Sequence, residues 1–130
     1  MKTQEIYTQL KKALDKLLEA MNFPDDDPHK ESTIQRFEYT FELSWKLMSS
    51  ILKDQGIESY GVKNIIREAY KLGLLDEISV WFKYAAARNM ASNIYAEGIA
   101  NEVYNTAKSG FVNYVKDFLT KAKRYVGSEI

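Results

Sequence analysis

The sequence predicts an all-α protein, organised as an antiparallel up-and-down four-helix-type bundle with one short accessory helix. Apolar residues recur at steps of three and four along most of the chain, which is the spacing that gathers side chains on one face of a helix. No segment alternates apolar and polar residues over the length of a strand. The chain has 130 residues, of which 45% are hydrophobic, so we expect residues 1–130 to form a single domain with a substantial core.

The first predicted helix ends where its apolar pattern meets Phe23-Pro24. The acidic residues 25–27 before Pro28 resemble a metal cluster, but consecutive carboxylates point in different directions. An Asp followed by Pro commonly caps and opens a helix, and we therefore predict a helix cap here. His29, the only histidine, is expected to be a solvated surface side chain.

The longest helical pattern runs from about residue 30 to residue 54 and is apolar on two sides. A helix with such wide apolar coverage normally lies at the centre of a bundle or at a subunit interface. Its polar strip includes Glu42 and Lys46, at a spacing that favours an ion pair. Arg36 lies on the flank beside the apolar positions, where an ion pair within the chain and a functional role are equally reasonable.

Glycines and polar residues divide the second half of the chain into three further helical patterns and a short helix. The short helix is predicted over residues 62–72, with Gly73 as its left-handed C-terminal stop. Asp76 is predicted to cap the next helix. A fifth helix, which carries Tyr95 on its inner face, is predicted to begin at a cap formed by Ser92 or Asn93. Residues 108–110 interrupt the pattern again before the last helix, which ends at about residue 127.

The polar segment Arg-Asn-Met-Ala-Ser-Asn-Ile-Tyr at residues 88–95 joins two of these helical patterns. Arg88 falls on the same stripe as Ile78, Trp81 and Ala85, which is expected to face inward. On periodicity alone, the more frequent explanation is structural. Arg88 would reach water near the C-terminus of its helix, where its charge complements the helix dipole. The functional alternative is a site for an anion or a nucleotide.

Composition excludes several classes of function. Lys and Arg balance Asp and Glu at 18 each, so no overall field attracts nucleic acid or an acidic membrane. The chain has no cysteine, which excludes disulfide scaffolds and thiolate metal sites. The motifs of familiar hydrolases and kinases, and the Glu-x-x-His repeats of di-iron bundles, do not occur. No run is apolar and long enough for a signal peptide or a membrane span, and we expect a cytoplasmic protein without metal or cofactor.

Three stretches together resemble one protein family. They are residues 32–46 (Ser-Thr-Ile-Gln-Arg-Phe-Glu-Tyr-Thr-Phe-Glu-Leu-Ser-Trp-Lys), Ile66-Arg67-Glu68-Ala69 ahead of Gly73-Leu74, and Arg88-Asn89 with Tyr95. The run Arg-Phe-Glu-(x)3-Glu-Leu-x-Trp-Lys is the most specific part, and the similarity extends over nearly the whole chain. On this resemblance the sequence is identified as a member of the nucleotidyltransferase substrate-binding proteins, which belong to the HEPN superfamily.

The resemblance implies a small helical bundle, usually a homodimer, that acts beside a separately encoded minimal nucleotidyltransferase. That partner would supply the metal-bound chemistry, while the helical protein binds substrate or is acted upon. This implies a non-catalytic subunit with a nucleotide or substrate pocket, in which Arg88 would meet phosphate with a forked, permanently charged group. The implied pocket residues are Arg88, Asn89, Ser92, Asn93 and Tyr95, with Arg36 and Glu38 in support.

Two alternatives stay open. Many HEPN relatives carry Arg-x4-His-x-Tyr and act as metal-independent ribonucleases in toxin–antitoxin pairs, with the arginine as a catalytic residue. Arg88 and Tyr95 match that motif, but Asn93 replaces the histidine and cannot titrate near the reference pKa of about 6.5. The first alternative is therefore a ribonuclease with weakened activity, silenced by its partner through nucleotidylation of Tyr95. The second is a structural dimerisation module in which Arg88 and Arg36 only neutralise acids such as Glu38 or Glu42.

Overall fold

The computed structural model describes residues 2–127, and within that range every regular element is a helix. The all-α prediction is confirmed. No helix among these residues has the length and apolar character needed to cross a membrane. In chain order the elements are α1 (Lys2–Ala20), α2 (Asp27–Asp54), α3 (Val62–Lys71), α4 (Ile78–Met90), the 3₁₀ helix η1 (Ala91–Asn93), α5 (Ile99–Lys108), α6 (Phe111–Ala122) and the 3₁₀ helix η2 (Lys123–Tyr125).

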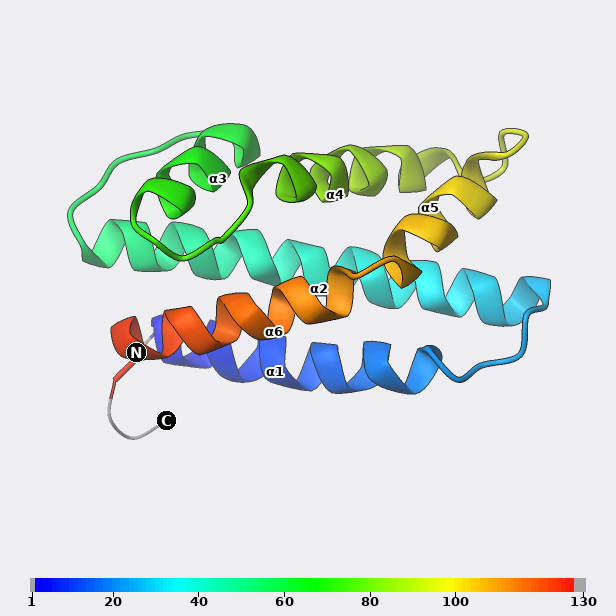
Figure 1. Ribbon diagram of the computed structural model, residues 1–130, viewed down its shortest axis with the longest axis horizontal. Coiled ribbons are helices and arrows are strands. Elements are labelled where there is room, and N and C mark those ends of the chain that lie inside the picture. Colours follow the sequence, from blue (N-terminus) through cyan, green and yellow to red (C-terminus); the bar gives the residue numbers. More distant parts are fainter. Residues whose placement is uncertain (1, 128–130) are drawn as a thin grey trace.

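The long helix α2 lies at the centre of the molecule. In Figure 1, α1 and α6 lie on one side of α2, and α3 and α4 lie on the other. Helix α2 contacts α1, α3, α4 and α5, and it buries side chains on opposite flanks, such as Phe41 and Leu43. Its two-sided apolar pattern therefore reflects its central position. Successive long helices run back and forth, and α5 and α6 together return across the molecule, with α5 against α2 and α6 against α1 (Figure 1).

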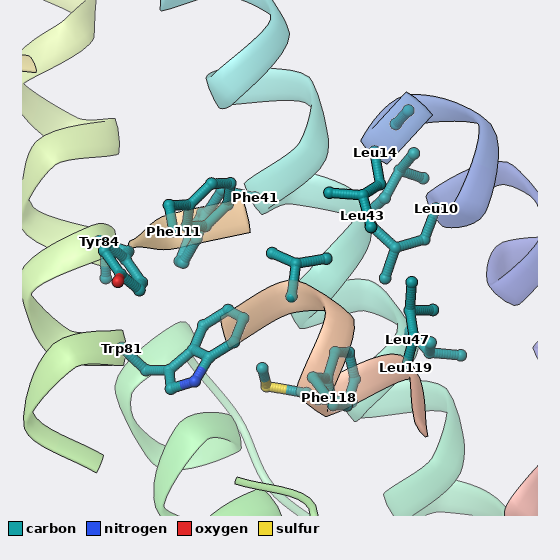
Figure 2. Packing of buried hydrophobic residues seen from close by; sticks show 14 of the residues in the cluster. Leu10, Leu14, Phe41, Leu43, Leu47, Trp81, Tyr84, Phe111, Phe118 and Leu119 are labelled. Atoms are coloured by element: carbon teal, nitrogen blue, oxygen red, sulfur yellow. The ribbon is translucent and has the colours of Figure 1, made fainter. Parts of the chain in front are cut away.

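Aromatic side chains from α2, α4 and α6 form one half of the core. The ring of Phe111 lies 4.8 Å from Phe37 and 4.8 Å from Tyr84, centroid to centroid, and 6.2 Å from Trp81. Figure 2 shows Trp81 and Tyr84 of α4 facing Phe41 and Phe111, while leucines of α1 and α2 gather on the other side. Because these rings come from three helices, their packing fixes α4 against α2.

The start of α2 confirms the predicted helix cap, one residue earlier than the Asp-Pro pair. Asp26 has an extended backbone conformation, and its carboxylate accepts a hydrogen bond from the backbone N–H of His29 at 3.0 Å. Pro28 lies in the first turn, where its missing N–H costs nothing. The Nδ1 atom of His29 lies 2.7 Å from the same carboxylate, at the protein surface.

Gly73 ends α3 in the left-handed conformation, with φ of +90°, as predicted. Asp76, however, does not cap α4. The residue before α4 is Glu77, which makes no side-chain capping bond. Asp76 is instead held by Lys121 of α6, whose Nζ lies 2.8 Å from its Oδ1. An ion pair with α6 therefore takes the place of the predicted cap.

The prediction that α5 begins at a Ser92 or Asn93 cap is wrong. Both residues belong to η1, and the Ser92 hydroxyl donates back to the carbonyl of Asn89 at 2.9 Å, which continues the helical path from α4. Residues 94–98 then form a turn, and α5 begins at Ile99 after Gly98, whose φ is +79°. Glycine adopts this left-handed conformation without steric cost. Tyr95 consequently lies in a turn and not on a helix.

Candidate functional site

Arg88 lies in the last turn of α4 and faces α2. Its Nε atom is 2.9 Å from Oε1 of Glu42, and its Nη1 atom is 3.8 Å from Oε2 of Glu38. These two acids are one turn apart on α2, which places their side chains on the same face. All three side chains are about 30% exposed. The inward Arg88 is thus a partly buried cation between two carboxylates.

Glu42 connects Arg88 to Trp45. Its second oxygen, Oε2, accepts a hydrogen bond from the indole Nε1 of Trp45 at 3.1 Å. The Nε atom of Arg88 is buried, and its N–H makes no hydrogen bond of acceptable geometry to Glu42 despite the short distance. The contact is therefore an ion pair. The carboxylate of Glu42 contacts Arg88 and Trp45. Glu42 and Lys46 both lie within the described residues, and the ion pair predicted between them does not form.

A cavity of about 450 Å³ opens beside this ion pair, between α2, α3 and α4. Arg88 and Asn89 line this cavity together with Lys63 and Arg67. These two cations of α3 were not predicted as site residues. Their four-residue spacing, which places both cations on one face of a helix, was the sequence feature that could have indicated them. The other residues that line the cavity are Phe41, Glu42, Trp45, Val62, Phe82, Ala85 and Ala86.

Arg67 is held in position by α3 and α4. Its Nη1 donates to Oδ1 of Asn64 at 2.7 Å. Its guanidinium carbon lies 5.4 Å from the ring centroid of Phe82, within the range of a cation–π contact. The guanidinium thus remains at the cavity with its charge unpaired by any acid in residues 2–127.

The rest of the polar segment does not share this cavity. Ser92 and Asn93 lie exposed on η1. Tyr95 is 92% exposed, and it borders a separate cavity of about 230 Å³ formed with the start of α2 and the start of α5. Within one chain, Arg88 and Asn89 therefore lie at one cavity and Tyr95 at another.

Arg36 points away from Arg88, towards α1. Its Nη1 donates to the backbone carbonyl of Lys16 at 2.6 Å and lies 3.6 Å from Oε1 of Glu19. Its guanidinium carbon also lies 4.9 Å from the ring centroid of Phe23. Arg36 therefore fastens α2 to the end of α1, and Glu38 is the supporting residue that contacts Arg88.

The tyrosine hydroxyls differ in their surroundings. Burial raises the pKa of Tyr84 to about 12, so its phenol stays protonated inside the core. The hydroxyl of Tyr114 donates to Oε1 of Glu77 at 3.0 Å, and this hydrogen bond raises the pKa of Tyr114. Tyr95 instead presents its ring to solvent in the turn before α5.

Comparison with known families gives one match over most of the chain. The family described as "Nucleotidyltransferase substrate binding protein like" matches residues 5–124. A curated Haemophilus influenzae protein named "Probable ribonuclease HepT" is 40% identical over 76 residues, which cover 55% of this chain and 52% of the relative. The chain thus matches about half of the length of that relative.

Two solved structures resemble the fold described here. A crystal structure of a Thermus thermophilus protein has a TM-score of 0.80 at 29% identity, and the match covers 88% of this chain and 99% of the other. A Haemophilus influenzae structure, described as revealing the fold of a substrate binding domain of a nucleotidyltransferase, has a TM-score of 0.67 at 27% identity. That match covers 93% of this chain and 96% of the other.

Proposed function

Because the chain belongs to the nucleotidyltransferase substrate-binding protein family, we propose that it is the helical component of a two-protein system whose other component is a minimal nucleotidyltransferase. The similarity to a probable ribonuclease HepT favours a ribonuclease-derived component over a purely substrate-binding one. In this proposal the protein is a homodimer in the cytoplasm, its ribonuclease chemistry is weakened, and the Tyr95 hydroxyl accepts a nucleotidyl group from the partner.

The position of Tyr95, in an exposed turn at the end of the Arg88-to-Tyr95 segment, carries this proposal. A phenol that is 92% exposed in a turn can enter the active site of a second protein without unfolding of a helix. The phenolic oxygen would attack the α-phosphorus of a nucleoside triphosphate, the bond to the leaving pyrophosphate would break, and the phenolic proton would pass to water or to a base of the transferase. Other tyrosines are also exposed, so the choice of Tyr95 rests on its place in the Arg88-to-Tyr95 segment.

Two residues support the proposal that ribonuclease activity is weakened. Asn93 provides hydrogen bonds but no titratable group for proton transfer. Loss of a general acid or base typically costs about two to four orders of magnitude in rate. In addition, Arg88 is paired with Glu38 and Glu42, and a bound phosphate would have to compete with those carboxylates.

A second candidate function is nucleotide or substrate binding without catalysis. It is supported by the position of Arg88 and Asn89 at the cavity between α2, α3 and α4. A purely structural role, the third alternative, is supported by the ion pairs of Arg88 and Arg36. Against that role, both side chains keep more than a quarter of their surface exposed, and Arg88 borders an open cavity.

The direct test is nucleotidylation in vitro. The protein is incubated with a minimal nucleotidyltransferase, Mg²⁺ and ATP labelled in the α-phosphate, and the modified peptide is identified by mass spectrometry. We expect label on the wild type and none on Tyr95→Phe. Tyr60→Phe is the matched control, since Tyr60 is 77% exposed but lies outside the segment. Unlabelled wild type, or label that persists in Tyr95→Phe, would contradict the proposal.

A further inference from the structure

We propose that the cavity between α2, α3 and α4 binds a nucleoside phosphate, with the phosphate on Lys63 and Arg67 and the base against Trp45 and Phe82. The inference rests on the second candidate function, nucleotide binding, and deepens it by naming the ligand class and the residues that hold each part. It is independent of the nucleotidylation of Tyr95, which borders a different cavity.

The charges that line the cavity favour an anion. The carboxylate of Glu42, the one acid among the lining residues, is opposed by Arg88 at 2.9 Å. Lys63 and Arg67 have no acid within 4.0 Å among residues 2–127. Two cations without an acidic partner therefore remain at one wall, and a phosphate is an anion that both lysine and arginine bind.

Helix α3 brings these two cations together. Lys63 and Arg67 are four residues apart, so their side chains project from the same face. The buried residues Ile65, Ile66 and Ala69 fix the opposite face of α3 in the core, which leaves the cations at the cavity. The cation–π contact with Phe82 and the hydrogen bond to Asn64 hold the Arg67 guanidinium in place, so little conformational entropy is lost when a phosphate binds.

The aromatic residues that line the cavity distinguish a nucleotide from a bare phosphate. Trp45 and Phe82 both line it, and the indole of Trp45 is oriented by its hydrogen bond to Glu42 at 3.1 Å. Aromatic faces beside cations are the combination that binds a base and its phosphate. The amide of Asn89 can donate to or accept from a base edge. A volume of about 450 Å³ lies within the usual range for small ligands, about 300–1,000 Å³.

Other cavities lack this combination. The one between α1 and α2 is lined by Lys12, Lys16 and Arg36, but Arg36 is already bound to Glu19 and to a backbone carbonyl. The cavity beside Tyr95 is lined by Asp27 and Glu31 as well as Lys30. Neither offers two unpaired cations next to two aromatic walls. The cavities of about 410 Å³ and 620 Å³ are each lined by a single aromatic residue, so the nucleotide is assigned to the cavity at Arg88.

The experiment uses the tryptophan at the cavity as a reporter in the full chain. Trp45 lines the cavity, whereas Trp81 is only 1% exposed in the core. Titration with ATP is expected to quench the fluorescence of the wild type. Trp45→Phe should lose the quenching, and calorimetry should show that this variant still binds ATP, because the phosphate contacts remain.

The charge variants decide the assignment. Lys63→Gln/Arg67→Gln should weaken ATP binding by about tenfold or more, since it removes the contacts to the phosphate. Lys116→Gln/Lys123→Gln removes the same charge from exposed positions on α6 and η2 and should leave the affinity within about twofold. Both substituted cations of the first variant are exposed, and thermal melting should show that this variant is folded. Equal losses in the two double variants, or no ATP binding by the wild type, would overturn the proposal.

Further probes separate the sources of the nucleotide. Tighter binding of ATP than of the RNA trinucleotide ApApA would identify a free nucleotide, and the reverse would identify the nucleotides of an RNA strand. Tripolyphosphate that binds as tightly as ATP would overturn the role of the aromatic walls. Nucleotidylation of Tyr95 without ATP binding by this protein would refute this inference alone. ATP binding that depends on Lys63 and Arg67, without nucleotidylation, would refute only the proposal for Tyr95.

Discussion

The Nε atom of Arg88 lies 2.9 Å from Oε1 of Glu42, although the two residues belong to different helices and are far apart in the sequence. Because Oε2 of the same carboxylate accepts from Trp45, Glu42 fixes the positions of a cation and an aromatic ring at one cavity. Glu42 therefore couples the packing of α4 on α2 to the geometry of the candidate binding site.

The first prediction concerns the strength of this ion pair. The side chains of Arg88 and Glu42 are 31% and 30% exposed, so solvent partly screens their attraction. A double-mutant cycle with Arg88→Ala and Glu42→Gln should give a measurable coupling, of at most about 1 kcal/mol. Urea unfolding measures it. The control cycle uses Lys71 and Glu68, 3.3 Å apart with Lys71 70% exposed, and should give a coupling close to zero. A coupling at Arg88–Glu42 no larger than in the control would contradict the prediction.

The second prediction concerns Asn93. If this residue occupies the place of a ribonuclease histidine, Asn93→His should restore a titratable group and raise RNA cleavage by about two to four orders of magnitude. Asn93 is exposed on η1, so an imidazole fits there without a change in packing. The readout is cleavage of a fluorescently labelled RNA, with activity changing near the reference histidine pKa of about 6.5.

Two controls belong to the Asn93 experiment. Asn93→Gln keeps an amide and should stay as inactive as the wild type. Arg88→Ala in the Asn93→His background should abolish the gain, since the motif needs its arginine. An Asn93→His protein with unchanged activity would argue that the exposed η1 position is no longer part of an RNA-cleaving site.

The periodicity of the sequence predicted the helices well, because helix formation in this chain follows from which residues are buried. The two apolar flanks of the residue 30–54 pattern correspond to a helix that is covered on both sides, and Gly73 ends α3 where the pattern stops. The four-helix-type bundle stays an interpretation of the arrangement in Figure 1. Helix boundaries that depend on tertiary contacts were harder to predict from periodicity. Asp76 occupies a position in the sequence that is typical of a helix cap, but its carboxylate forms an ion pair with Lys121 on α6.

The candidate site was predicted only in part. The inward position of Arg88 follows from its stripe, and Glu38 and Glu42 were proposed as its structural partners, as observed. Tyr95 was placed on the fifth helix, whereas it lies in the turn between η1 and Gly98 and borders a different cavity from Arg88. The four-residue spacing of Lys63 and Arg67 places them on one face of α3, but only the packing of α3 on α2 and α4 brings that face to the cavity.

The third prediction tests the aromatic core. Phe111 is fully buried and contacts rings from α2 and α4. Phe111→Ala should therefore lower the free energy of unfolding by about 3–5 kcal/mol, because it removes buried area and leaves a cavity. Phe111→Leu keeps most of the volume and should cost clearly less. Urea denaturation measures both, and a loss below about 1 kcal/mol for Phe111→Ala would show that the core can collapse around the missing ring.

The fourth prediction concerns the pH dependence of the Asp76–Lys121 ion pair. The hydrogen bond from Lys121 lowers the pKa of Asp76, and hydrogen bonds to Asp117 and Asp76 raise the pKa of Lys121. A lowered carboxyl pKa stabilises the fold above the unfolded-state value of about 3.9, and this stabilisation is lost as the pH falls through the lowered pKa. A raised amine pKa stabilises the fold below about 10.4, and that stabilisation is lost as the pH rises through the raised pKa.

Asp76→Asn should therefore lower the melting temperature at pH 7 by a small amount, about 1–3 °C, because Asp76 is exposed and Lys121 keeps its contact with Asp117. The difference from the wild type should shrink as the pH falls from the unfolded-state value of about 3.9 through the lowered pKa of Asp76, because the wild-type carboxyl then becomes protonated. Asp15→Asn is the control, since Asp15 is exposed and forms no ion pair within residues 2–127. A difference for Asp76→Asn that stays constant from pH 7 to pH 2 would assign the effect to lost packing, because an electrostatic contribution must disappear with the charge.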